Sequence, residues 1–369
     1  MPGERLLYSK GVQITANRWT QTVQAMKKIS QQSLAQKAPS SVAPALRQGY
    51  SSLPSLKGLD KDSVNHLSRP DGLDSLHEQG FDGSGVTVAV IDSGVARHQD
   101  FGDRIKAFKD FGSKRRAPFD PRGHGTHVAG IILGDGEKVD GIAPRADLVS
   151  CRVASPDEAV KALDWVIANR EKYSIDVVNL SLGAPANPDP EKDELRKAAE
   201  RAVAAGLVVV ASAGNECDGP SCVASVTSPG IAPNVITVGA LDDHGTRKRS
   251  DDDIWTLSSQ GGKGLGKPDL VAEGVNVVSV LAPGSDYAEN AGVNAAYVAA
   301  SGSSQATSVV TGAAALLKQA NPALSNSDIK RILMETADPL RGVAKASQGA
   351  GRLDLKEAVE VAQAMRKKA

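Results

Sequence analysis

Three short polar stretches of the chain contain residue types that nucleophilic catalysis needs. The first holds Asp92, which follows an apolar run and begins an Asp-Ser-Gly sequence. Ligand sites of open α/β sheets lie beyond the carboxyl ends of the strands, so an acid at this place can face such a site. A turn or helix-capping aspartate is the ordinary alternative. The stretch alone does not decide between the two.

The second stretch, residues 123–130, has the sequence GHGTHVAG. Glycines on both sides of His124 allow close backbone approach and leave the imidazole unobstructed. Such a histidine can act as a general base when one ring nitrogen reaches a hydroxyl and the other meets an acid. The alternatives are a buried structural histidine and a metal site shared with His127. For a metal site, the spacing of His124 and His127 lacks the glutamate and the i,i+4 geometry of the zincin helix.

The third stretch, residues 301–306, has the sequence SGSSQA and opens an apolar helix. Its Ser304 lies at the positive end of the helix dipole, which favours the charge that develops when a hydroxyl attacks. An ordinary N-cap serine is the alternative. A further polar residue, Asn215, ends a Ser-Ala-Gly-Asn run directly after a buried strand. Its amide can therefore reach over the end of a sheet.

The segments between these stretches alternate between strands and helices. Apolar runs predict strands at residues 86–91, 147–153, 175–182, 207–211 and 235–240, and helices at 128–133, 157–169, 191–205 and 304–320. Such alternation predicts a mostly parallel sheet covered by helices on both faces. We therefore expect one three-layer α/β domain over residues 71–369.

Residues 1–70, here called the leader, differ from this domain. Residues 1–48 contain seven Lys or Arg against one acid, Glu4. Apolar residues between Trp19 and Ile29 follow helical spacing, and residues 38–54 are rich in Pro and Ser. The leader cannot bury a core of its own. It is either a basic tail or targeting peptide, or a segment that docks on the domain.

Bulk composition narrows the class of protein. An apolar fraction of 41% and a charged fraction of 23% fit a soluble globular protein. Lys+Arg and Asp+Glu both count 43, so no nucleic-acid partner is indicated. No run approaches the roughly 18 apolar residues of a membrane-spanning helix. The first residues lack the apolar core of a secretory signal peptide, so we expect a cytoplasmic protein or export by another route.

Three cysteines are too few for a disulfide scaffold. Cys151 alternates with valines in a strand pattern and is expected to be a small core residue. Cys217 and Cys222 stand five apart in one loop, where they can pair, and the sequence does not decide whether they do.

The motifs, in the order Asp, His, Asn, Ser, resemble those of the subtilase family of serine peptidases. The resemblance runs from residue 73 to residue 362 and includes 141–144 (GIAP), 178–183 (VNLSLG), 228–230 (SPG), 267–270 (KPDL) and 349–353 (GAGRL). It implies a subtilisin-like fold and a serine endopeptidase that hydrolyses peptide bonds through an acyl-enzyme.

The resemblance also implies a role for each candidate residue. Ser304 would be the nucleophile, His124 the general base, and Asp92 the acid that orients it. Asn215 would donate to the oxyanion together with the Ser304 N–H. An extended substrate would add a strand along two pocket walls. The walls and floor of this primary pocket would be Ser181, Leu182, Gly183, Ala213, Gly214 and Thr227, with Glu216 nearby to favour a basic or polar group.

Four residues depart from the family pattern. Ser303 stands where Thr is usual, Gln305 where Met is usual, and Ser308 and Glu273 where Pro is common. We expect these changes to alter substrate range and efficiency rather than the chemistry.

No cofactor is required for this chemistry. Structural calcium is common in the family, and Asp135, Glu137 and Asp140 lie in a Gly-rich loop, but their spacing is not diagnostic and no metal site is assigned. Residues 251–253 (DDD) are expected to form a solvated acidic turn.

The expected partners are a protein or peptide substrate and the leader itself, since many subtilases cut their own N-terminal propeptide. We expect such a cut between residues 38 and 59. Two alternatives use the same fold. A catalytically silent binding module is disfavoured by the intact triad. A peptide-processing enzyme or macrocyclase would instead pass the acyl group to an amine. We expect hydrolysis rather than this transfer, because the sequence shows no large insertion near the site that would exclude water.

Overall fold

The computed structural model describes residues 69–367 except 114, 218–221, 223, 247, 263 and 292–295. It also describes the backbone of three short strands nearer the N-terminus, β1 (Leu7–Ser9), β2 (Val12–Ile14) and β3 (Gly49–Ser51). The helix expected between Trp19 and Ile29 and most of the Pro/Ser-rich segment lie outside the described residues. The boundary at residue 70 stays a prediction, although buried Arg69 already packs on the domain through Asp140 O.

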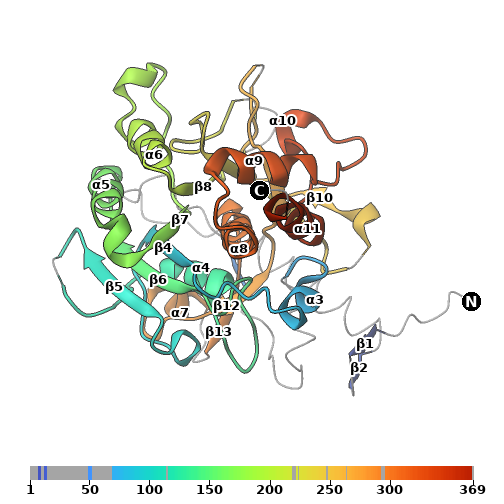
Figure 1. Ribbon diagram of the computed structural model, residues 1–369, viewed down its shortest axis with the longest axis horizontal. Helices are drawn as coiled ribbons and strands as arrows, with labels where there is room; N and C mark the ends of the chain where they lie inside the picture. Colours follow the sequence, from blue (N-terminus) through green and yellow to red (C-terminus); the bar gives the residue numbers. More distant parts are fainter. Residues whose placement is uncertain are drawn as a thin grey trace, which may run out of the picture.

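One sheet runs through the centre of the molecule (Figure 1). Its strands follow the order β10-β9-β8-β7-β4-β6-β5, with β11 also paired to β9. The pairs are parallel except for β10, which runs antiparallel to β9. The strands are β4 (Thr87–Asp92), β5 (Ile105–Asp110), β6 (Asp147–Arg152), β7 (Ile175–Leu180), β8 (Val208–Ser212), β9 (Ile236–Asp242), β10 (Asp253–Ile254) and β11 (Leu270–Glu273).

Helices cover both faces of this sheet, which makes three layers. One face carries α4 (His124–Leu133), α8 (Ser303–Ala320), α9 (Asn326–Glu335) and α11 (Leu355–Arg366), and the other carries α5 (Pro156–Tyr173) and α6 (Glu194–Ala204). Alternation along β4 shows why both faces are apolar. Val88 and Val90 belong to the first core, whereas Ala89 and Ile91 belong to the second.

The expected α/β class and layers are confirmed, and the predicted strands and helices differ from the observed ones only at their ends. β5, β10, β11, α9, α11 and the antiparallel pair β12 (Val277–Val280) and β13 (Tyr297–Ser301) were not predicted from the sequence. The remaining short helices are α3 (Leu73–Glu78), α7 (Asp286–Ala291), α10 (Lys345–Gln348), η2 (Gln99–Phe101), η3 (Pro190–Lys192) and η5 (Arg249–Asp251).

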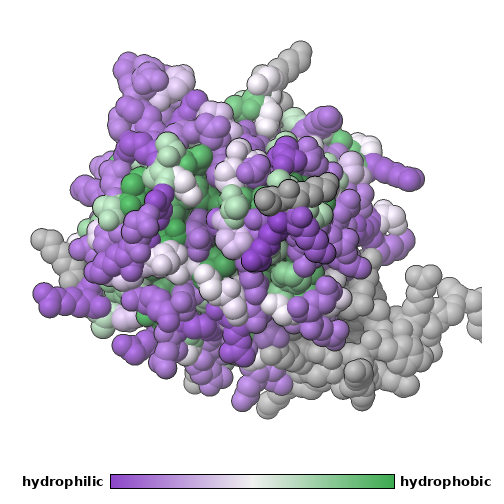
Figure 2. All heavy atoms as spheres, viewed as in Figure 1, coloured by the Kyte–Doolittle hydropathy of each residue, from purple (hydrophilic) through white to green (hydrophobic). Residues whose placement is uncertain are grey.

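Helix α8 lies in the middle of the first core. Apart from Lys318 and Gln319, its residues are buried, and its N-terminus follows β13 after the single residue Gly302. None of the described helices is long and apolar enough to cross a membrane. The face shown in Figure 2 is mostly hydrophilic, with smaller apolar areas between the polar side chains.

A buried ion cluster joins the C-terminal part of the domain to the sheet. Arg352 donates to Asp252 at 2.7 Å and to Glu273 at 2.8 Å, and all three side chains are buried. The expectation of a solvated acidic turn is therefore wrong for Asp252, because an arginine far along the chain takes it into the interior. Glu273, one of the departures from the family pattern, is the second of these carboxylates, and Asp71 Oδ2 lies 3.6 Å from Arg352 Nη2 as a third.

A neighbouring carboxyl, that of Asp243, makes the stability of the fold depend on pH. Burial, and then the charge of Glu273, raise the pKa of Asp243 to about 7. The pKa of Asp243 is higher in the folded than in the unfolded chain. Its contribution to the free energy of unfolding is therefore fully present below about pH 4 and is lost as the pH rises through 7. Asp243→Asn keeps an acceptor for the Gly245 N–H and removes the ionisation.

We therefore expect Asp243→Asn to raise Tm by about 2 °C more at pH 8 than at pH 5. Melting curves should be measured in a Ser304→Ala background, to exclude self-digestion. An equal shift at both pH values would contradict the assignment of this group.

Candidate active site

Asp92 is the last residue of the central strand β4 and is buried. Its neighbours in the sheet, β6 and β7, run parallel to it, so their carboxyl ends open at the same edge. Asp92 Oδ1 accepts from the Ser93 N–H at 2.6 Å. The carboxylate is thus fixed at the sheet edge where a ligand site is expected.

His124 is the first residue of α4 and meets this carboxylate. Its Nδ1 lies 2.7 Å from Asp92 Oδ1, and both side chains are buried. Gly123 has φ +87°, where other residues are strained, and a Cβ on Gly125 would lie 2.2 Å from Gly94 O. The two glycines therefore permit the approach of α4 to the end of β4, as the sequence indicates.

A second, buried carboxylate holds the same loops and was missed from the sequence. Asp120 accepts from the Ser93 hydroxyl, from the Gly123 N–H and from both the N–H and hydroxyl of Thr126. Ser93 Oγ in turn accepts from the Gly125 N–H. Asp120 therefore ties the loop after Asp92 to the helix start that carries His124. The sequence around Asp120 does not indicate this role.

Ser304 is the second residue of α8 and lies between the ends of β7 and β13. Its hydroxyl donates to Ser181 O at 3.1 Å. His124 Nε2 is buried and has no hydrogen-bond partner among the described residues. The Tyr287 ring packs edge-on against the His124 ring, with centroids 6.0 Å apart, and this contact was also missed.

Asn215 follows β8, and its side-chain orientation is fixed by the residue next to Ser304. Asn215 Oδ1 accepts from the Ser303 N–H at 2.9 Å and from the Ser303 hydroxyl at 2.8 Å. With its oxygen held in this way, Asn215 has only its NH₂ group left to offer to a ligand. The hydroxyl that Ser303 keeps in place of Thr thus positions Asn215.

A small pocket opens beside Ser304. The structure leaves about 10 Å³ of free space in it, and Thr227 is one of its lining residues. Thr227 N–H and Oγ1 both donate to Ala213 O, at 2.9 and 3.3 Å. The lining includes Ser181, Leu182, Gly183, Gly214 and Thr227 from the expected set, together with Ser212, Asn215, Glu216, Ser303 and Ser304. Ala213 is not among these lining residues, although its carbonyl oxygen accepts from Thr227.

Comparisons with known proteins agree with this geometry. A model of the subtilase family matches residues 83–352. The chain belongs to the subtilase family. It is 35% identical over 301 residues to the serine protease AprX of Bacillus subtilis, over 76% of this chain and 67% of AprX. It is 37% identical over 274 residues to subtilisin BL of Lederbergia lenta, over 72% of this chain and 88% of that protein.

This subtilase is accordingly a serine endopeptidase, a hydrolase that acts on peptide bonds. A protein substrate follows from that activity.

A hollow of about 630 Å³ lies along β5, lined by Arg97, Lys106 and Arg116 among others, and none of the four catalytic candidates lines it.

The second histidine of the subtilase motif has a structural role. His127 is fully buried, and burial lowers its pKa to about 3, so its ring is neutral. Its Nε2 donates to Val298 O at 3.1 Å, and its Nδ1 accepts from Gln305 Nε2 at 3.5 Å. Gln305, in place of the usual Met, therefore contacts His127, while its Oε1 is buried without a partner among the described residues. Ser308 donates to Ser304 O at 2.8 Å.

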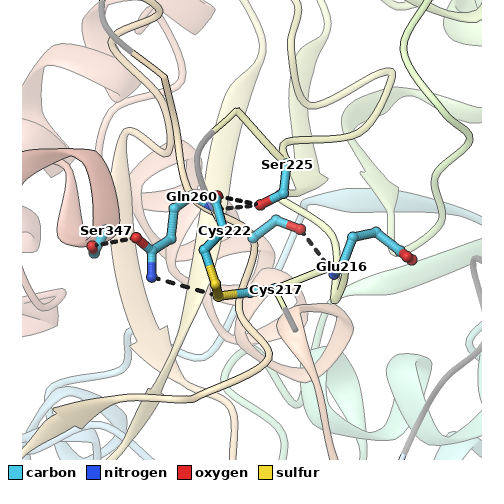
Figure 3. The surroundings of a disulfide bond; sticks show 7 residues. Glu216, Cys217, Cys222, Ser225, Gln260 and Ser347 are labelled. Carbon is cyan, nitrogen blue, oxygen red and sulfur yellow. Dashed lines mark hydrogen bonds between the residues drawn. A yellow bond between two sulfur atoms is a disulfide. The ribbon is translucent and has the colours of Figure 1, made fainter. Parts of the chain in front are cut away.

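A disulfide stands just beyond the oxyanion candidate. Cys217 and Cys222 are bridged, which the sequence left open (Figure 3). Gln260 Nε2 approaches Cys217 Sγ at 3.6 Å, and Gln260 Oε1 accepts from the Ser347 hydroxyl. The bridge closes a short loop after Asn215, and Gln260 links this loop to Ser347 in the C-terminal part of the domain. Cys151 is a buried free thiol in β6, as expected.

Two residues of the acidic loop considered for calcium, Asp135 and Asp140, make contacts within the protein. Asp135 pairs with Arg145 at 3.2 Å, and the backbones of Asp135 and Asp140 form a β-bridge. Within the described part of the chain, no three His, Cys, Asp or Glu side chains gather closely enough to hold a metal ion.

Proposed function

We propose that Ser304 attacks the peptide carbonyl, with His124 as general base and Asp92 as the group that orients the base. The observation that carries the proposal is the 2.7 Å contact between Asp92 Oδ1 and His124 Nδ1. A carboxylate can only accept, so the proton belongs on Nδ1 and Nε2 is left as a base. In this proposal the Ser304 hydroxyl, which here donates to Ser181 O, donates to His124 Nε2 instead when it attacks.

In the same proposal, two hydrogen-bond donors stabilise the negative charge of the tetrahedral intermediate. Asn215 offers its NH₂ group, because Ser303 holds its oxygen. The Ser304 N–H lies at the N-terminus of α8, where the helix dipole adds positive potential. His124 then protonates the leaving amine, and water cleaves the ester. All these groups are protein atoms, so the proposed chemistry needs no cofactor.

We further propose that the substrate binds as an extended strand and places a small side chain in the pocket beside Ser304. The pocket offers about 10 Å³, less than a methylene-rich side chain needs. Thr227 Oγ1 would lie only 2.4 Å from a Cβ placed on Gly183 and 3.0 Å from one placed on Gly214, so this side chain lies close to both segments. Alanine, serine or glycine is the expected residue on the N-terminal side of the cut.

Thr227→Gly is expected to raise kcat/KM for cleavage after Phe or Leu by about tenfold or more relative to cleavage after Ala, because each buried methylene contributes to binding. Product analysis on a peptide library measures this ratio. Thr227→Ser, which keeps the hydrogen bond to Ala213 O and removes one methyl group, is the matched control and should shift the ratio less. An unchanged preference in Thr227→Gly would contradict the role of the floor residue.

The leader is proposed as a second partner that the enzyme cuts itself. Its excess of basic residues stands against a domain with more acidic than basic residues. No nucleic-acid partner is proposed, because Lys+Arg and Asp+Glu both count 43 in the whole chain.

A further inference from the structure

The hollow of about 630 Å³ along β5, here called the β5 hollow, is a second concave surface. Its volume lies in the range of roughly 300–1,000 Å³ that ligand pockets occupy. β5 is the last strand of the sheet order, at the end away from β10 (Figure 1). β6 pairs with one of its edges, and no strand of residues 69–367 that the structure describes pairs with the other. Such a free edge can bind an extended peptide as a further strand.

The β5 hollow follows this free edge rather than one face of the sheet. Its lining includes four consecutive residues of β5, 105–108. Successive residues of a strand point to opposite faces of a sheet, so a surface that touches four in a row runs along an edge. Because β6 pairs with β5 from Ile105 to Asp110, the hollow lies on the other edge.

The rim of the β5 hollow is basic. Arg97, Lys106 and Arg116 line it, and Asp103 is the one acid in its lining. All three cations are exposed. Within the described part of the chain, only Lys106 has a charged partner, Asp147 at 3.2 Å. An ion pair that is this exposed contributes little, so a carboxylate of a ligand can replace it.

The sequence around the hollow explains this charge. Residues 97–122 contain eight Lys or Arg and four Asp. Three of these aspartates, Asp100, Asp110 and Asp120, are buried, and their carboxylates accept from groups of the protein. None of the three lines the hollow. The hollow is therefore a basic site on a domain that has more acidic than basic residues.

The β5 hollow shares two segments with the active site. Arg97 continues the loop that follows Asp92. Pro118 also lines the hollow, and it precedes Phe119, whose carbonyl oxygen would lie 2.2 Å from a Cβ placed on Gly94. No residue lines both the hollow and the pocket beside the nucleophile. A ligand in the hollow would thus lie beside the catalytic loops and leave that pocket free.

We propose that the free edge of β5 and its basic hollow bind an acidic, extended segment of protein substrates, away from the bond that is cut. The segment adds a strand to β5 and places carboxylates against Arg97, Lys106 and Arg116. The leader does not suit this site, because residues 1–48 carry seven Lys or Arg against one acid. The inference goes beyond the proposed function and does not depend on which residue attacks the peptide bond.

The test compares peptides that share one site cleaved after alanine and differ in a tail. A Gly/Ser spacer of about 15 residues, which spans roughly 20 Å, joins the site to the tail. The first tail alternates Glu and Val. The second alternates Gln and Val, which removes the charge. The third is the Glu/Val tail with every backbone amide N-methylated, which keeps the charge and removes the N–H groups that a strand donates.

Each peptide is cleaved by three full-length enzymes. They are the wild type, a hollow variant with Arg97→Gln, Lys106→Gln and Arg116→Gln, and a matched control with Lys161→Gln, Arg341→Gln and Lys345→Gln. The control changes three exposed cations outside the hollow and alters the net charge equally. Initial rates at several salt concentrations give kcat and KM, and product mapping confirms the cleaved bond.

We expect the wild type to cleave the Glu/Val peptide with roughly tenfold higher kcat/KM than the Gln/Val peptide, through a lower KM. This gain should shrink as salt rises, because the cations are exposed. The hollow variant should lose the gain and cleave the Gln/Val peptide at the wild-type rate, which also shows that it is folded. The matched control should keep the gain, and the N-methylated tail should lose most of it.

No gain in the wild type, or an equal gain in the hollow variant, would overturn the proposal. A full gain with the N-methylated tail would overturn strand addition to β5. A single-stranded oligonucleotide that competes with the Glu/Val peptide better than a free Glu/Val tail does would assign the hollow to nucleic acid instead. If the triple variant does not fold, Arg116→Gln alone should reduce the gain about twofold, and an unchanged gain would contradict the proposal.

Discussion

Ser304→Ala is expected to lower kcat for peptide hydrolysis by about a million-fold, the loss found when the nucleophile of subtilisin is removed. The group lost is the hydroxyl at the start of α8 that donates to Ser181 O in this structure and that we propose as the nucleophile. Steady-state kinetics on a peptide cleaved after alanine measure the effect. The activity that remains should come only from substrate binding and the oxyanion donors.

Ser303→Ala is the matched control, because it removes a neighbouring hydroxyl. Ser303 Oγ is engaged with Asn215 Oδ1, so its loss should slow turnover far less than the loss of Ser304. A Ser304→Ala enzyme with a tenth of wild-type activity, in a preparation shown free of wild type, would contradict the assignment of the nucleophile.

Asn215→Ala is expected to lower kcat by about 100- to 1000-fold with little change in KM, a magnitude borrowed from the corresponding donor of subtilisin. The amide would bind the oxyanion, which exists only in the transition state and intermediate, so substrate binding should be nearly unaffected. Initial rates over a range of substrate concentrations separate the two parameters.

Asn215→Asp provides a sharper comparison. Aspartate keeps an oxygen that can accept from Ser303 N–H and Oγ, but as a carboxylate it has no N–H to donate. Its loss in kcat should equal or exceed that of the alanine variant. A rise in KM alone, in either variant, would argue against the oxyanion role and for a role in substrate binding.

The sequence predicted the elements that carry the site because their signals are local. β4 is a continuous apolar run that ends at Asp92, and α8 is apolar on all sides, so both could be assigned as buried. The glycines beside His124 indicated a close approach, and the structure shows that approach against Gly94 O.

Residues whose roles depend on distant partners could not be found in this way. Tyr287 meets the site from another segment, and Asp120, three residues before Gly123, acts by also accepting from Ser93 in the loop after β4; neither stands in a recognisable motif. β12 and β13 are short strands joined by a long connection, so neither length nor a hairpin turn indicated them. Asp252 was misassigned because an acidic run in the sequence does not show that Arg352, 100 residues away, neutralises it.

The most direct test of the central claim is to locate the residue that a fluorophosphonate modifies. The probe reacts with a serine only when a base activates it, so the adduct marks the nucleophile. Peptide mapping by mass spectrometry should place the adduct on Ser304 in the wild type, and His124→Ala should label very slowly. An adduct on Ser303, Ser308 or any other residue, or labelling at the wild-type rate without His124, would contradict the account.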